Sequence, residues 1–158
     1  MRAKELMTTP PYTCGVHDMA SVAAQIMWDH DCGVVPVLDD DGRVAGVVTD
    51  RDLCMAAHLR GLPLFSIPIK TVMSGDVCSC RPDDDVDAVE RRMSERQVRR
   101  VPVTDAGGRP LGMLSLSDLA LGLQRLGDIQ KRPGQELAVT VAAICRPRDE
   151  RPAIGRAS

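Results

Sequence analysis

Apolar residues recur at helical spacing in two separate stretches of the chain, and two short runs rich in β-branched residues follow each stretch. The first stretch begins after Asp18, a residue type that caps helices, and its apolar positions are Met19, Val22, Ala23, Ile26 and Met27. The second stretch begins near Asp84, and its apolar positions are Val86, Val89 and Met93. Both stretches therefore predict an amphipathic helix with one buried side.

Each predicted helix is followed by two predicted strands joined by a turn. The strands read GVVPVLD and VAGVV in the first half of the chain, and RRVPVTD and PLGML in the second. The intervening sequences, DDDGR and AGGR, contain glycines that hairpin turns favour. A closing helix is predicted to begin near Thr49 and again near Ser115, and Gly61 is predicted to end the first one. With a short lead-in strand, each half is predicted to be a β-α-β-β-α unit of a mixed α/β (α+β) fold.

The two units are copies of one another. A shift of 66 residues, without a gap, aligns the Val-Pro-Val triplets and many single residues, including Lys4 with Lys70, Met7 with Met73, Cys14 with Cys80 and Asp52 with Asp118. Two copies indicate a duplicated module and not a solenoid.

The repeat also predicts the organisation of the chain. The predicted ranges are 2–61 for the first unit, 62–69 for a link, 70–124 for the second unit and 125–158 for a tail. Because one unit of this size buries little apolar surface and the link is short and apolar, the units are expected to pack face to face. A short helix predicted at 135–145 could cover a subunit interface or dock on its own domain.

Composition narrows the classes of function. Charges of both signs are interspersed and the net charge is −2, which gives no electrostatic basis for binding nucleic acid. No apolar run approaches the roughly 18 residues of a membrane span, and the N-terminus lacks the apolar core of a signal peptide. We therefore expect a cytoplasmic protein without membrane contact. Aromatic side chains are limited to Tyr12, Trp28 and Phe65, so aliphatic side chains are expected to hold any flat ligand.

The corner between the last strand and the closing helix has the same polar pattern in both units, Thr49-x-x-Asp52 and Ser115-x-x-Asp118. One interpretation is a helix cap, which contributes on the order of 1 kcal/mol at each place. The other is a ligand site. A carboxylate in the first turn suits the two hydroxyls of a ribose, and the helix N-terminus suits a phosphate.

Two glycines precede these corners, Gly46 and Gly112, one in each second strand. Glycine in a strand often marks a place where another group approaches the backbone closely. In the ligand interpretation, these glycines are expected to leave room for the bound molecule.

The Val-Pro-Val strand, the turn, the glycine-containing strand and the G-x-x-[ST]-x-x-D corner recur at matching distances over about residues 2–124. This ordered set resembles a tandem pair of CBS domains, called a Bateman module. The resemblance implies two motifs packed about a pseudo-two-fold axis, two clefts between them, and a homodimer. It also implies a non-catalytic regulatory sensor of an adenosine-containing ligand (AMP, ADP, ATP or S-adenosylmethionine), with no redox cofactor and an effector protein as its partner.

The resemblance assigns roles to the corner residues. Asp52 and Asp118 would hold ribose, while Thr49 and Ser115 would contact the sugar–phosphate end. The corner recurs in register with the whole pattern, which favours the ligand interpretation over capping alone.

The two halves differ in the cations available for phosphate. Arg100 stands just before the second Val-Pro-Val strand, where the first half has Val34. Arg51 could serve the first cleft, whereas its counterpart Ser117 could not. The resemblance implies that Arg100 is the better phosphate ligand, and a solvated charge at a strand edge is the alternative. A guanidinium fork suits phosphate oxygens, so the cleft with Arg100 is predicted to be the better nucleotide site.

Other functions are weaker interpretations of the same sequence. A zinc or redox site could use Cys14, Cys78 and Cys80 with His17 nearby, but Cys-x-Cys is not a usual zinc spacing, and buried thiols are favoured. No metal site is therefore predicted. No nucleophile–base motif or phosphate-binding loop supports an enzyme. A dimerisation module without ligand remains an alternative, since a cap and a ribose site use the same residues.

Overall fold

A computed structural model describes residues 1–125 of the chain, so the predicted tail helix at 135–145 lies outside the described residues. The first half contains β1 (Cys14–Gly15), α1 (Ala20–Asp29), β2 (Val34–Leu38), β3 (Val44–Thr49) and α2 (Asp50–Arg60). The second half contains α3 (Val86–Arg96), β4 (Arg100–Thr104), β5 (Pro110–Ser115) and α4 (Leu116–Arg125). Three short 3-10 helices are η1 (Ala3–Glu5), η2 (Leu64–Ser66) and η3 (Ile69–Thr71). The mixed α/β fold is confirmed, and so is the predicted order of elements in both halves apart from the lead-in strand of the second.

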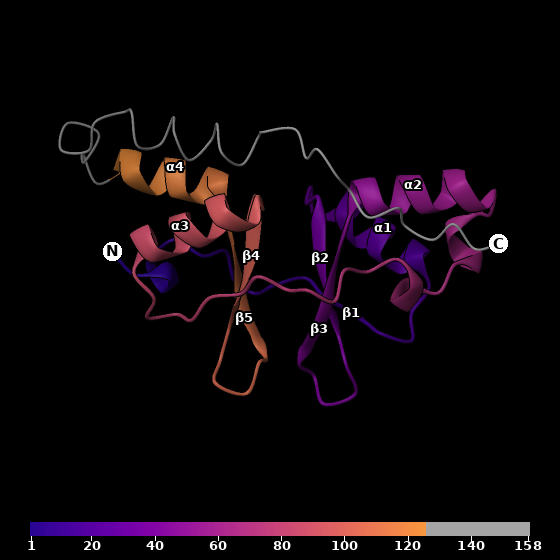
Figure 1. Cartoon of the computed structure of the whole chain (residues 1–158), viewed down its shortest axis with the longest axis horizontal. Helices are drawn as coiled ribbons and strands as arrows, with labels where there is room; N and C mark the ends of the chain where they lie inside the picture. The colour runs from indigo at the N-terminus through magenta and orange to yellow at the C-terminus, as the bar shows by residue number, and fades with distance from the viewer. Residues whose placement is uncertain (126–158) are drawn as a thin grey trace.

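The two hairpins lie side by side in the middle of the molecule, and the helices lie on their outer sides, α1 and α2 beside one hairpin, α3 and α4 beside the other (Figure 1). Strand β2 pairs antiparallel with β3 and parallel with β1, and β4 pairs antiparallel with β5. In the second half the lead-in strand is reduced to one parallel bridge between Cys80 and Val103. The Val44 amide donates to the Gly108 carbonyl at 3.0 Å, which joins the two hairpins.

One helix end lies where the sequence predicted it, and one helix cap was predicted wrongly. Gly61 ends α2 in the left-handed conformation with φ 62°, as predicted. Asp18 was predicted to cap the first helix, and this is wrong, because α1 begins at Ala20 after Met19. The Asp18 carboxylate instead accepts from the Gly15 amide at 2.7 Å and closes the turn before the helix.

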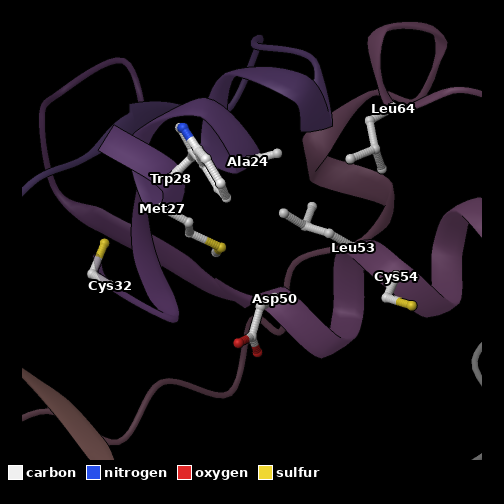
Figure 2. A pocket seen from close by; sticks show the side chains of 8 residues that line it. All are labelled: Ala24, Met27, Trp28, Cys32, Asp50, Leu53, Cys54 and Leu64. Carbon is white, nitrogen blue, oxygen red and sulfur yellow. The ribbon is translucent and has the colours of Figure 1, made fainter. Parts of the chain in front are cut away.

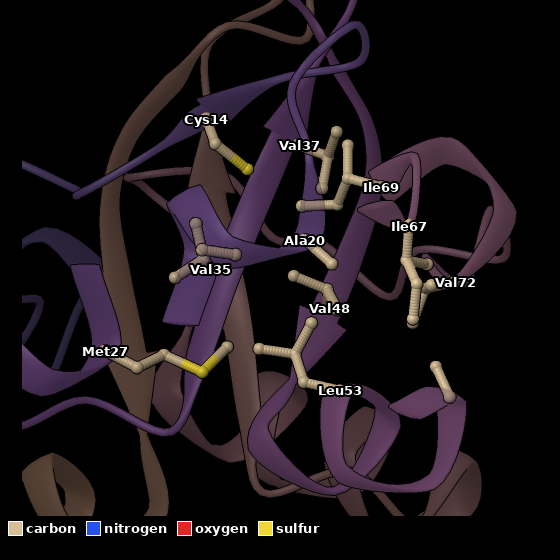
Figure 3. Packing of buried hydrophobic residues seen from close by; sticks show 12 residues of the cluster. Cys14, Ala20, Met27, Val35, Val37, Val48, Leu53, Ile67, Ile69 and Val72 are labelled. Atoms are coloured by element: carbon tan, nitrogen blue, oxygen red, sulfur yellow. The ribbon is translucent and has the colours of Figure 1, made fainter. Parts of the chain in front are cut away.

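Each core is completed by a segment from the other side of the repeat. Ile67, Ile69 and Val72, which follow the first unit in sequence, are buried against β2 and β3 of the first core (Figure 3). In the same way Ala3, near the N-terminus, is fully buried in the second core. The segments that lead into the two units are therefore exchanged, and neither core is complete without the other half.

The exchanged segments also extend the sheets. Thr8 pairs with Met113 at the edge of β5, and Ser74 pairs with Val47 at the edge of β3. These pairs are related by the same shift of 66 residues as the rest of the repeat. The pseudo-two-fold relation therefore includes the lead-in segments as well as the hairpins and helices.

The two strand glycines make room for this exchange and not for a ligand, which corrects the interpretation drawn from the sequence. A Cβ atom on Gly46 would lie 2.8 Å from the Met73 Sδ and 2.9 Å from the Ser74 carbonyl oxygen. On Gly112 it would lie 2.8 Å from the Thr8 carbonyl oxygen. Only glycine leaves space for a neighbouring backbone at this distance.

Gly46→Ala is expected to lower the free energy of unfolding by about 1–3 kcal/mol, because the new methyl group overlaps the exchanged segment. Urea denaturation measures the change. Gly75→Ala is the matched control, since a Cβ there would meet only the Ala45 carbonyl oxygen, at 3.9 Å. An equal effect of both substitutions would contradict a specific role for the close approach at Gly46.

Candidate functional site

Both corners form the cap that the sequence predicted. In the first, the Thr49 amide and hydroxyl donate to Asp52 Oδ2 at 2.9 and 2.7 Å, and the Asp52 amide donates to Thr49 Oγ1 at 3.2 Å. In the second, the corresponding distances between Ser115 and Asp118 are 2.8, 2.6 and 3.1 Å. The two corners therefore have nearly the same geometry.

The cap leaves part of each carboxylate available. In both corners the hydrogen bonds are made by Oδ2, and within residues 1–125 no hydrogen bond uses Oδ1 of Asp52 or Asp118. Both aspartates are half-buried and held in one rotamer by their caps. Capping and ligand binding are therefore compatible at this corner, because they use different oxygens.

A cleft of about 350 Å³ lies between the two halves beside the second corner. Three of the residues predicted to bind ligand line it together: Arg100, Ser115 and Asp118. The exchanged N-terminal segment and the end of α1 supply much of the opposite wall, with Thr8, Pro10, Pro11, Tyr12, His30, Asp31, Cys32 and Val34. This volume is within the range of pockets that hold small molecules.

Arg100 has space in this cleft because of a glycine in the other half. A Cβ atom on Gly33 would lie 3.3 Å from Arg100 Nη1 and 3.1 Å from Asp50 Oδ2. The guanidinium therefore lies against the loop after α1, where a larger residue than glycine would crowd it.

The other three predicted ligand residues, Thr49, Arg51 and Asp52, do not line this cleft. Thr49 and Asp52 occupy the pseudo-symmetric corner, and Arg51 is exposed on the first turn of α2. The structure thus brings Arg100, Ser115 and Asp118 together in one cleft and leaves Thr49, Arg51 and Asp52 outside it.

Tyr12 and His30 belong to the cleft but were not predicted as site residues. Their rings stack with centroids 3.5 Å apart and an angle of 7° between the planes. The repeat contained a signal that could have placed Tyr12 in the cleft. Once Thr8 pairs with Met113, the residues that follow Thr8 must pass the Ser115–Asp118 corner.

The positions equivalent to this stack are different in the other half. In the repeat alignment Arg96 replaces His30 and Cys78 replaces Tyr12. Arg96 Nη2 lies 2.6 Å from Oδ1 of Asp76, two residues before Cys78. One corner therefore faces two stacked rings, while its counterpart is accompanied by an ion pair.

The cysteines do not form the zinc site considered from the sequence. Cys14 is buried in the first core and Cys80 in the second, so the pseudo-symmetry separates them. His17 lies 3.0 Å from Asp40. Across the described residues, no group of three or more histidine, cysteine or acidic side chains is placed to hold a metal ion.

Burial makes these thiols poor nucleophiles. Desolvation, helped by the Asp18 charge, raises the pKa of Cys14 from 9.0 to about 12. Desolvation, helped by the Asp84 charge, raises the pKa of Cys80 from 9.0 to about 11. The pKa of Cys78 is also raised by burial, although Arg96 and Arg92 oppose the shift.

Cys14 and Cys80 are expected to resist alkylation by iodoacetamide in the folded protein at pH 8. A pKa of about 12 leaves roughly a thousandfold less Cys14 thiolate than a pKa of 9.0. Peptide mass spectrometry after alkylation, with urea-unfolded protein as the control, measures the labelling at each position. Rapid labelling of either thiol in the folded state would support a redox role.

None of the helices within residues 1–125 is long and apolar enough to cross a membrane.

Comparison with known proteins identifies a family model and relatives that match this chain. The family model described as CBS domain matches residues 3–59 and again residues 69–125. The chain is 38% identical to protein YlbB of Bacillus subtilis (strain 168) over 127 residues. This aligned region covers 78% of this chain and 82% of that protein.

Two solved structures are similar in fold. The CBS domain pair of protein MJ0100, in complex with 5′-methylthioadenosine and S-adenosyl-L-methionine, has a TM-score of 0.70 and 25% identity, covering 78% of this chain and 96% of that one. Hypoxic Response Protein I, with two coordinated zinc ions, has a TM-score of 0.70 and 29% identity, covering 77% of this chain and 98% of that one.

Proposed function

The chain belongs to the CBS domain family as a tandem pair, and from this premise we propose that it is a regulatory module that binds an adenosine-containing ligand without catalysis. The ligand class comprises AMP, ADP, ATP and S-adenosylmethionine. The observation that carries the proposal is the convergence of Arg100, Ser115 and Asp118 on one cleft of about 350 Å³.

The chemistry of the cleft matches the parts of a nucleotide. Asp118 offers a fixed carboxylate oxygen to the ribose hydroxyls, and Ser115 lies next to it at the N-terminus of α4. Arg100 offers a guanidinium to a phosphate. The apolar surface for the base comes from Val34, Met113 and the proline-rich N-terminal segment.

The relatives support the same class of ligand. The CBS domain pair of MJ0100 binds two adenosine compounds, and its fold matches this chain over nearly all of its own length. Methylthioadenosine and S-adenosylmethionine lack phosphate, whereas Arg100 favours a ligand that carries one. We therefore place AMP, ADP or ATP ahead of S-adenosylmethionine in this cleft.

The other corner is proposed as a second and weaker site. Thr49 and Asp52 reproduce the carboxylate geometry, and Arg51 is the cation nearest in sequence. Its position equivalent to Arg100 is Val34, which offers no charge. Unequal affinity of the two sites follows from this difference.

The same proposal covers the biological setting. It describes a cytoplasmic homodimer in which residues 2–61 and 70–124 form the two motifs, 62–69 joins them and 125–158 is a tail. As the resemblance to CBS pairs implies, the module would act through an effector protein. A bound nucleotide is expected to be recovered unchanged after hours of incubation, as chromatography of the ligand would show.

Calorimetric titration with AMP is expected to show binding that Asp118→Ala weakens at least tenfold, because a hydrogen bond to a charged group is worth about 1.5–3 kcal/mol. Asp52→Ala is the matched control. It removes a cap of nearly the same geometry, so both variants should lose a similar stability of about 1 kcal/mol. A larger loss of affinity in Asp52→Ala would contradict the proposed ranking, and no binding of any adenosine compound would contradict the ligand class.

Arg100→Gln separates the phosphate contact from the rest of the site. The substitution is expected to lower the affinity for AMP by about tenfold or more. It should lower the affinity for 5′-methylthioadenosine by less than about threefold, since that ligand has no phosphate. Calorimetry with the two ligands measures the ratio. Arg91→Gln, at an exposed position of α3, is the control. Equal losses for the two ligands would remove Arg100 from the phosphate site.

A further inference from the structure

Two aromatic side chains, Tyr12 and His30, lie face to face on the wall of the ligand cleft. Both line the cleft together with Asp118, and their ring centroids are 3.5 Å apart with 7° between the planes. Both side chains are exposed, Tyr12 to 42%. The pair therefore presents ring surface to the same space as the residues proposed to bind ribose and phosphate.

The backbone holds Tyr12 in place from both sides. Four residues earlier, Thr8 exchanges two backbone hydrogen bonds with Met113 of the second half, at 2.8 and 3.0 Å. Two residues later, Cys14 begins β1, which pairs with β2 of the first half. Two prolines lie between Thr8 and Tyr12, and proline restricts the backbone because its ring fixes φ. Tyr12 is therefore anchored to both halves of the molecule.

The His30 ring, in contrast, is held by the stack alone within the described residues. The His30 amide donates to the Ile26 carbonyl at 3.1 Å at the end of α1, but no hydrogen bond or ion pair among residues 1–125 involves the imidazole. An exposed side chain of this kind changes rotamer rapidly, in picoseconds to nanoseconds. The imidazole can therefore leave Tyr12 while the backbone of α1 keeps its hydrogen bonds.

The stack has the geometry of a contact between an aromatic residue and a nucleotide base. An imidazole is the five-membered part of a purine, and the His30 ring lies parallel to Tyr12 as a stacked base would. The centroids are closer than the roughly 4.5–7 Å of offset or edge-to-face pairs, so the two rings are nearly eclipsed, which is a less favourable arrangement. A purine has a second ring and can stack with an offset. We expect a purine to bind Tyr12 more strongly than His30 does.

The other half has no such pair. In the repeat alignment Cys78 stands in place of Tyr12 and Arg96 in place of His30. Neither a thiol nor an ion-paired guanidinium provides a stacked pair of flat rings. The stack therefore belongs only to the cleft that also contains Arg100, the cleft proposed as the better nucleotide site.

We propose that Tyr12 is the stacking platform for the base of the ligand and that His30 occupies this platform until the base displaces it. This role rests on the proposed adenosine site and adds the step by which the base enters it. Arg100 and Asp118 bind the phosphate and the ribose, while the exchange at Tyr12 opens the rest of the cleft. The sequence led to the expectation of aliphatic side chains around a flat ligand, and the Tyr12 ring revises this expectation for one face of the base.

The displaced His30 lies next to a second hollow. Trp28, two residues earlier, lines a hollow of about 400 Å³ between α1 and α2 (Figure 2). Cys32, two residues later, lines both this hollow and the ligand cleft. Trp28 is the only tryptophan of the chain, so its fluorescence is expected to change when a base moves His30.

Titration of the full chain with AMP and with ribose 5-phosphate, followed by NMR, separates the base from the rest of the ligand. Tyr12→Leu is expected to lower the affinity for AMP by at least about fivefold, the low end of the effect of removing a base–aromatic stack. It should change the affinity for ribose 5-phosphate by less than about twofold, because that compound has no base to stack. Tyr12→Phe keeps the ring and is expected to bind both compounds as the unsubstituted chain does.

His30→Ala removes the internal competitor and is expected to raise the affinity for AMP by about two- to tenfold, the strength of an aromatic pair expressed as an equilibrium constant. His58→Ala, which changes an exposed histidine in the last turn of α2, is the matched control and should leave the affinity within about twofold. Unchanged thermal unfolding shows that both variants remain folded.

The imidazole protons of His30 report the exchange directly, because the ring current of Tyr12 shifts their resonances while the rings are stacked. AMP is expected to move these resonances to their positions in ligand-free Tyr12→Leu. Ribose 5-phosphate should leave them in place.

Three results would overturn the exchange and leave the adenosine site standing. A lower affinity for AMP in His30→Ala makes His30 a ligand contact and not a competitor. Equal losses of AMP and ribose 5-phosphate in Tyr12→Leu assign the ring to packing, and bound AMP with unmoved His30 resonances places the base elsewhere. Absence of AMP binding in both the unsubstituted chain and His30→Ala rejects the site and the exchange together, whereas binding by His30→Ala alone supports the exchange.

Discussion

The close approach of two backbones at Gly46 and Gly112 is the constraint on which the arrangement of the molecule depends. At these positions the strand accepts the lead-in segment of the other unit, with a carbonyl oxygen less than 3 Å from where a Cβ would stand. Ile67 and Ile69 can then fill the first core and Ala3 the second. Because each core contains residues from the segment that leads into the other unit, the halves cannot separate without exposing both cores. The cleft between them is thus fixed by the packing that stabilises the fold.

The elements and the repeat could be predicted from the sequence because they depend on local periodicity. Helical spacing, strand alternation and turn glycines act within a few residues, and the copies confirm one another in register. The exchange of the lead-in segments could not be predicted in this way, since it joins residues far apart in the chain. The same limit explains the two errors. Gly46 and Gly112 were assigned to a ligand, and Asp18 to a cap, because their actual partners are set by tertiary contacts.

The candidate site shows the same division. Asp118, Ser115 and Arg100 could be found from the sequence because each belongs to a pattern within the second unit. Tyr12 and His30 could not, because they reach the cleft from the N-terminal segment and from the end of α1. Duplication supplies two equivalent corners, and a few substitutions around them make the corners different. Three pairs of equivalent residues distinguish the two corners: His30 and Arg96, Tyr12 and Cys78, and Val34 and Arg100.

The end of α1 connects the ligand cleft with a second hollow, which lies between α1 and α2. Cys32 lines both hollows, while Trp28 lines the one between α1 and α2 and His30 stacks on Tyr12 in the ligand cleft. A ligand that contacts His30 or displaces it from the Tyr12 ring acts within one helical turn of Trp28. Such a ligand can shift the arrangement of this segment only by the difference between its affinities for the two arrangements. A regulatory module requires that difference, and residues 28–32 form the shortest covalent path between the two surfaces on which it can be expressed.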